Sequence, residues 1–111
     1  MDREILGKIQ ETVRERDPAV LATVIRASGS APRSAGARML IWQDGSISGT
    51  IGGGPLEGEI ITKAVELLEN ENDEPGRFHF DLSNQDVASA GGVCGGQVEV
   101  FLEPLILKEE S

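Results

Sequence analysis

Three consecutive glycines, Gly52, Gly53 and Gly54, join a predicted strand to a predicted helix. Glycine lets the backbone approach a ligand closely, and the free amides at the start of a helix bind anions, so this turn is a candidate phosphate site. It matches neither G-x-G-x-x-G, because Glu57 occupies the sixth position, nor the P-loop pattern. Pro55 also lacks an amide donor. A tight turn whose helix is stabilised by Glu57 is the alternative interpretation.

Two arginines accompany a second candidate site, a loop that is rich in small residues and hydroxyl groups. Arg33 and Arg38 lie in or beside a stretch that contains Ser28, Ser30 and Ser34. The planar guanidinium group suits phosphate or carboxylate recognition, because its N–H groups bind two oxygens at once. Exposed arginines that only balance an acidic surface are the alternative. The position of Arg33 between a proline and a glycine favours the binding role.

The only cysteine, Cys94, lies in a second glycine cluster at 91–96. A lone cysteine cannot form an internal disulfide, and with His79 as the only histidine the chain has no metal-binding pattern of the usual spacing. Flanking glycines favour exposure of the side chain, and a thiol placed near arginines would be more nucleophilic. A buried small apolar side chain is the alternative. We therefore treat Cys94 as the candidate reactive group and His79 as a surface residue.

These candidate groups need a scaffold, and the apolar periodicity predicts two helices in it. The first covers 2–16, with Leu6, Ile9 and Val13 on its apolar stripe. The second covers 55 to about 70, with apolar side chains at helical spacing. Prolines or glycines follow both helices and end them.

Five strands are predicted, at 19–27, 37–42, 46–51, 77–82 and 97–103. The first is apolar throughout, as a buried central strand is, and Asp44-Gly45 predicts a tight hairpin between the second and third strands. The expected fold class is α/β: a single domain with a mixed β-sheet of about five strands, on which an N-terminal helix and a central helix pack. In this interpretation one domain covers 1–111, with a helix at 1–17, an α/β core at 19–104 and a tail at 105–111.

The composition argues against several classes of function. The 111 residues suffice for one domain, and the net charge of -9 argues against a nucleic-acid or anionic membrane partner. The chain contains no apolar run near the roughly 20 residues that span a bilayer, and its first residues do not resemble a signal peptide. We therefore expect a cytoplasmic protein.

Several short motifs, taken in order, resemble the amino-terminal domain of the XdhC/CoxI family, the xanthine dehydrogenase accessory factors. The resemblance extends from about Leu21 onward. It is carried by LATV at 21–24, GSAPR at 29–33, GARM at 36–39, GTIGGG at 49–54, LE at 56–57, CGG at 94–96 and VEVFLEP at 98–104. The chain departs from many members in having Pro55 where they have a cysteine, and in ending at Ser111 without a Rossmann-like carboxy-terminal domain.

The resemblance implies an accessory protein rather than an enzyme: a chaperone that binds the molybdenum cofactor, molybdopterin, transiently and hands it to a molybdenum hydroxylase of the xanthine dehydrogenase type. Other implied partners are a separate Rossmann-domain protein or a cysteine desulfurase, and a second copy of the chain in a homodimer. No structural metal is expected. The expected cofactor contacts are Ser30, Arg33, Arg38, Gly52, Gly53, Gly54, Glu57 and Cys94. Cys94 would face the reactive end of the cofactor.

Two other functions stay open at this point. One is an oxidoreductase-like domain that binds a nucleotide or another phosphorylated ligand through the glycine turn, although the missing nucleotide motifs count against it. The other is a ligand-free dimeric interaction module that uses its apolar sheet edges. Replacing Arg33 and Cys94 with alanine would leave partner binding by such a module unchanged.

Overall fold

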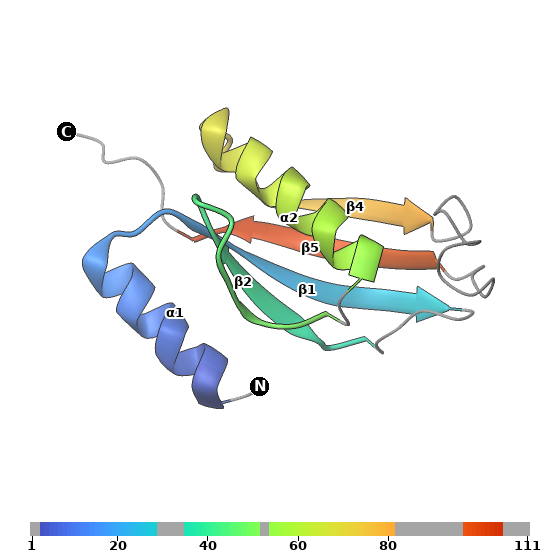
Figure 1. The fold of residues 1–111 in the computed structure, drawn as a ribbon, viewed down its shortest axis with the longest axis horizontal. Helices are drawn as coiled ribbons and strands as arrows, with labels where there is room; N and C mark the ends of the chain where they lie inside the picture. Colours follow the sequence, from blue (N-terminus) through green and yellow to red (C-terminus); the bar gives the residue numbers. More distant parts are fainter. Residues whose placement is uncertain (1–2, 29–34, 52–53, 82–96, 106–111) are drawn as a thin grey trace.

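The computed structural model describes residues 3–28, 35–51, 54–81 and 97–105, and all of the predicted helices and strands are present (Figure 1). The elements follow in the order α1 (Arg3–Glu15), β1 (Ala19–Ser28), β2 (Arg38–Trp42), β3 (Ile47–Gly49), α2 (Gly54–Glu69), β4 (Gly76–Asp81) and β5 (Gln97–Pro104). The fold class expected from the sequence, one α/β domain with five strands and two helices, is confirmed.

The five strands form one sheet in the order β3-β2-β1-β5-β4, and each neighbouring pair is antiparallel. The sheet is therefore antiparallel rather than mixed. The reason is the path of α2, which carries the chain from β3 at one edge to β4 at the opposite edge. Because β3 and β4 are not neighbours, this crossover produces no parallel pair.

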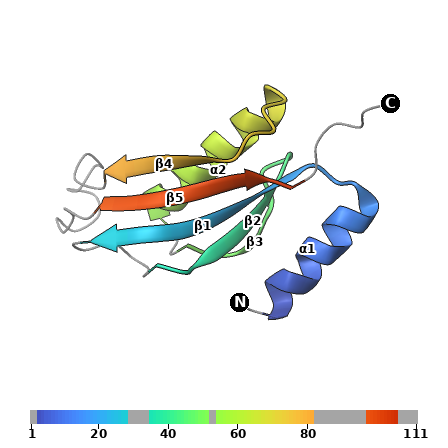
Figure 2. The same cartoon turned by 180° about the vertical axis from the view of Figure 1, so that it is seen from behind.

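The central strand β1 is buried on both faces, which explains its continuous apolar sequence. Val20, Ala22 and Val24 belong to the main core, which α2 covers, whereas Ala19 and Leu21 belong to a smaller core with α1. The two helices thus contact opposite faces of the sheet. Seen from the front and from behind, α2 lies across the sheet and α1 lies beside the end where β1 begins (Figures 1 and 2).

The apolar stripe expected on α1 is correct for Ile9, which packs against the smaller core, and wrong for Leu6 and Val13. Leu6 and Val13 are 45% and 49% exposed, whereas Ile5 and Thr12 are each only 3% exposed. The buried stripe is therefore Ile5, Ile9 and Thr12, and the helix is rotated from the expected stripe by less than the roughly 100° between successive residues.

Two contacts from distant parts of the chain explain this rotation. The Trp42 indole Nε1 donates a hydrogen bond of 3.3 Å to the Thr12 hydroxyl, which itself donates to the Lys8 carbonyl at 2.6 Å. Ile5 packs so closely on Gly49 that a Cβ there would lie 3.1 Å from the Ile5 Cδ1. Both contacts favour the face of α1 that carries Ile5 and Thr12.

The predicted hairpin at Asp44-Gly45 is confirmed. Gly45 has a φ of 89°, and the Trp42 amide donates to the Ser46 carbonyl at 2.9 Å to close the turn. The Asp44 Oδ1 accepts the Ser46 hydroxyl at 2.6 Å and the Ser46 amide at 2.9 Å. These hydrogen bonds to the ionised form lower the pKa of Asp44, the hydroxyl having the largest effect.

Candidate functional site

The segments that lead into the candidate loops leave the sheet at one end. In the strand register Ser28, the last residue of β1, lies opposite Gln97, the first residue of β5. Gln97 in turn lies opposite Asp81, the last residue of β4. The helix α2 also begins toward this end of the molecule (Figure 1). The expected contacts Ser30, Arg33, Gly52, Gly53 and Cys94 lie outside the described residues.

Arg38 is the expected ligand contact with the clearest geometry. It begins β2 opposite Thr23, and the backbone just before it is tied to β1, since Val24 donates to the Ala37 carbonyl at 2.9 Å and accepts from the Gly36 amide at 2.7 Å. The Arg38 Nε is buried and has no hydrogen-bond partner within the described part of the chain. A buried donor on a cationic side chain calls for an acceptor, and an anion supplies one.

A β-bulge interrupts β1 near Arg38. The pairing of β1 with β5 shifts between Val24 and Arg26, so Ile25 is the extra residue, and its side chain is 40% exposed. Bulges are frequent beside functional sites because they redirect side chains and bend the strand. The apolar run of this strand gave no signal for the bulge, which the sequence interpretation therefore missed.

Glu57 reaches back across the glycine turn. Its Oε2 accepts the Thr50 hydroxyl at 2.7 Å and the amide of buried Ile51 at 3.2 Å, which joins the first turn of α2 to the segment after β3. The arrangement resembles a capping box, in which a helix carboxylate binds an amide that precedes the helix. The sequence interpretation missed this contact because Thr50 and Glu57 are farther apart than the two ends of the usual S/T-x-x-E pattern. Thr50 was nevertheless a possible partner that the sequence showed. Glu57 thus stabilises the turn that was expected to bind the ligand.

Replacing Glu57 with alanine is expected to lower the free energy of unfolding by about 1–2 kcal/mol, since the part-buried Ile51 amide loses its acceptor. Urea denaturation followed by the fluorescence of Trp42, the only tryptophan, measures this change. Glu69→Ala, which removes an exposed carboxylate from the end of the same helix, is the matched control and should change the stability little. Equal urea midpoints for the two variants would contradict the stabilising role.

The structure places the three expected contacts that it describes, Arg38, Gly54 and Glu57, on two faces of the sheet. Alternation along β2 puts Arg38 on the same face as Leu40, which packs in the α1 core, while α2 with Gly54 and Glu57 covers the opposite face. Arg38 lies in a row across the strands with Thr23 and then Phe101. Among the described residues the geometry therefore provides an arginine and an aromatic ring on the α1 side.

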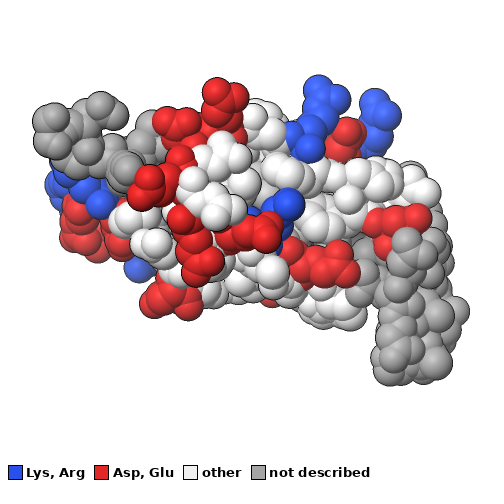
Figure 3. Space-filling model, turned by 90° about the horizontal axis from the view of Figure 1, so that it is seen from above, with Lys and Arg blue, Asp and Glu red and all other residues white. Residues whose placement is uncertain are grey.

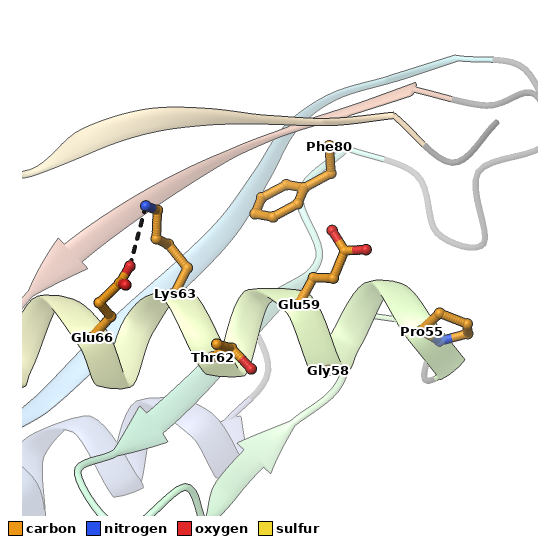
Figure 4. A pocket seen from close by; sticks show the side chains of 7 residues that line it. All are labelled: Pro55, Gly58, Glu59, Thr62, Lys63, Glu66 and Phe80. Atoms are coloured by element: carbon orange, nitrogen blue, oxygen red, sulfur yellow. Dashed lines mark hydrogen bonds and ion pairs between the residues drawn. The ribbon is translucent and has the colours of Figure 1, made fainter. Parts of the chain in front are cut away.

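A cavity of about 630 Å³ lies between α2 and β4 (Figure 4). It is lined by Pro55, Gly58, Glu59, Thr62, Lys63, Glu66 and Phe80. The only cation in this lining, Lys63, bonds to the Glu66 carboxylate at 3.3 Å and lies 5.2 Å from the centre of the Phe78 ring. With two carboxylates in its walls and the amine already paired, this cavity does not suit a phosphate.

On the face seen in Figure 3, Asp and Glu side chains are more abundant than Lys and Arg side chains. No three His, Cys, Asp or Glu side chains within ranges 3–28, 35–51, 54–81 and 97–105 are grouped as metal ligands. Neither of the two described helices is long and apolar enough to cross a bilayer.

The model of the XdhC and CoxI family matches residues 12–81. Among curated proteins, the uncharacterized protein YqeB of Escherichia coli (strain K12) is 36% identical over 77% of this chain and 15% of its own length. The molybdenum cofactor insertion chaperone PaoD of the same organism is 29% identical over 93% of the chain and 31% of its own length.

Among solved structures, a xanthine dehydrogenase from Bacillus halodurans is similar, with a TM-score of 0.74 and 36% sequence identity. The match covers 95% of this chain and 30% of that one. The chain thus spans about a third or less of the length of these relatives.

Proposed function

Since the chain belongs to the XdhC and CoxI family, we propose that it is an accessory domain that binds the molybdenum cofactor and delivers it to a molybdenum hydroxylase. One relative is named a molybdenum cofactor insertion chaperone, and its similarity extends over 93% of the chain. The similar solved structure is named a xanthine dehydrogenase. These names support a client of the xanthine dehydrogenase type.

The observation that carries the proposal is the buried Arg38 Nε, which has no hydrogen-bond partner in the described part of the chain. The cofactor carries a phosphate, and a guanidinium group binds phosphate oxygens through strong, charge-assisted hydrogen bonds. The protein has a net charge of -9 and therefore repels anions in general. A buried cationic donor without a hydrogen-bond partner in the described part of the chain gives an anion one specific place to bind.

The rest of the cofactor would lie along the sheet face that Arg38 shares with Thr23 and Phe101. The half-buried Phe101 ring offers a flat apolar surface to a planar pterin, and the Thr23 hydroxyl between them is a hydrogen-bond donor or acceptor. The bound cofactor would supply the molybdenum centre and its reactive ligands. The chain's own residues would hold and orient it, and Cys94 remains the candidate thiol for the reactive end.

The chain, mixed with molybdenum cofactor without oxygen and passed through a sizing column, is expected to co-elute with both molybdenum and pterin. Molybdenum is measured by mass spectrometry, and pterin by the fluorescence of its oxidised form. Folded protein that elutes without either would overturn the proposed function. The same experiment is repeated with ATP in place of the cofactor. A chain that retained ATP but not the pterin would instead be a nucleotide-binding domain.

Replacing Arg38 with glutamine is expected to weaken binding of the cofactor at least about tenfold, since a hydrogen bond to a charged group contributes about 1.5–3 kcal/mol. The bound fraction is separated by ultrafiltration at a series of cofactor concentrations and oxidised, and the fluorescence of the oxidised pterin gives the dissociation constant. Arg14→Gln, which removes an exposed arginine from α1, is the matched control and should bind like the unaltered chain. Equal affinities for the two variants would exclude Arg38 from the site.

The proposal also includes a cytoplasmic location and a homodimer. A separate Rossmann-domain protein or a cysteine desulfurase would be a further partner of the chain. Pull-down of a tagged chain from its own cells, with and without molybdate in the medium, tests for the hydroxylase client.

A further inference from the structure

One edge of the sheet is open in the part of the chain that the structure describes. The order β3-β2-β1-β5-β4 puts β3 and β4 at the two edges. β3 is only three residues long and packs against α1, and short or covered edge strands resist further pairing. β4 has six residues and pairs, among the described strands, with β5 alone.

The sequence of β4 is well suited to accept another strand. Its register with β5 runs without a shift from Gly76 to Asp81, so no bulge turns this edge away, and it contains no proline. Polar and aromatic side chains alternate along it, with Phe78 and Phe80 toward α2 and Arg77 and His79 exposed on the other face. An edge strand with one apolar and one polar face offers a partner strand the hydrogen-bonding groups of its backbone and side-chain contacts on both faces.

The cavity between α2 and β4 borders this edge. Figure 4 shows the Phe80 ring between β4 and α2, with Glu59 and Lys63 extending from the helix on its side and Pro55 at the start of the helix. A strand added to β4 would project alternate side chains to the same face, about 5 Å from those of β4, and hence toward this cavity of about 630 Å³. Apolar side chains on the added strand would fill it, as in strand-addition complexes.

We propose that the partner strand is β4 of a second copy, paired antiparallel about His79. In this register Arg77 lies opposite Asp81 of the second copy, and the twofold symmetry forms that pair twice. Phe78 lies opposite Phe80 of the second copy on the face toward α2, so an aromatic ring of each copy lies beside the ring that lines the cavity of the other. Opposite charges and aromatic pairs directly across a ladder both stabilise pairing.

This register is better than its neighbours. A register shifted by one residue would place Phe78 opposite a polar residue of the second copy. Because directly facing residues lie on the same face of a sheet, each face would then combine the apolar side chains of one copy with the polar side chains of the other. A symmetric pairing about Phe78 or Phe80 would leave Arg77 without Asp81 opposite it. Arg77 is 67% exposed and its contact with Glu99 is 3.8 Å long, so its guanidinium group remains accessible. The inference rests on the homodimer of the proposed function but not on the cofactor.

Cysteine cross-linking of the full chain in a Cys94→Ser background tests the register. His79→Cys would place two thiols on directly facing residues, whose Cα separation of about 4.5–5.5 Å suits a disulfide. Arg77→Cys, on the same strand, would separate the thiols by about 14 Å. We expect a disulfide-linked dimer of His79→Cys under mild oxidant and little of Arg77→Cys. Equal cross-linking of the two variants, or none of either, would overturn the proposal.

A charge exchange tests the same interface without cysteines. Sedimentation velocity should show the unaltered chain at twice the 11.8 kDa of one copy. Arg77→Asp and Asp81→Arg, each alone, should shift it toward monomer because like charges then face each other, and the double exchange should restore the dimer. Circular dichroism confirms that each variant is folded. A monomeric unaltered chain, or a double variant no better than the singles, would overturn the inference, whether or not the chain binds cofactor.

Discussion

Replacing Gly49 with alanine is expected to lower the free energy of unfolding by about 3 kcal/mol, as a sum of backbone strain and a steric clash. Gly49 ends β3 with a φ of 86°, where an L-residue is strained. An added Cβ would also lie 2.8 Å from the Arg38 carbonyl oxygen and 3.1 Å from the Ile5 Cδ1. The Ile5 side chain can move, but the backbone carbonyl is fixed in the sheet. Urea denaturation measures the loss.

Gly7→Ala is the matched control for this substitution. Gly7 lies inside α1, where a Cβ would meet nothing within 4 Å and the backbone is helical. Alanine is a better helix former, so this variant should gain about 0.5–1 kcal/mol. Opposite signs for the same chemical change would show that the position of each glycine matters. A Gly49→Ala variant as stable as the unaltered chain would contradict the close contact of β3 with α1 and β2.

Replacing Ile60 with alanine is expected to lower the free energy of unfolding by about 3 kcal/mol, within the range for large-to-small substitutions in cores. Ile60 is 0% exposed and belongs to the main core between α2 and the sheet. Its loss leaves a cavity beneath the helix that carries Gly54 and Glu57. Thermal unfolding followed by circular dichroism, together with urea denaturation, measures the change.

The adjacent Ile61 provides a control with identical chemistry. Ile61 is only partly buried at the margin of the same core, so Ile61→Ala should cost about half as much. If both variants lost the same stability, α2 would have to pack on the sheet through a different face.

The helices and strands could be predicted because the local pattern is strong. Apolar residues recur at helical spacing in α2, and Pro75-Gly76 and Asp44-Gly45 mark the breaks. The antiparallel sheet could not be predicted in the same way. Alternation says which residues share a face of one strand, but the partner of each strand depends on the path of the connections across the sheet.

The rotation of α1 shows the same limit. Apolar or small side chains occur in neighbouring pairs, Ile5 with Leu6 and Thr12 with Val13, so two stripes were available. The choice between them depends on Trp42 and Gly49, which are distant in sequence and meet α1 only in the folded chain.

For the candidate site, the sequence indicated the kinds of residue and the turns that carry them, and the family match confirms the identification that these motifs suggested. Glycines, arginines and a lone thiol are recognisable from side-chain chemistry, because that chemistry belongs to each residue. The position of a residue in space, in contrast, is determined by the strand register. Pairing with β1 places Arg38 on the α1 side of the sheet with its Nε buried, and the Thr50 and Ile51 contacts give Glu57 a part in stabilising the glycine turn.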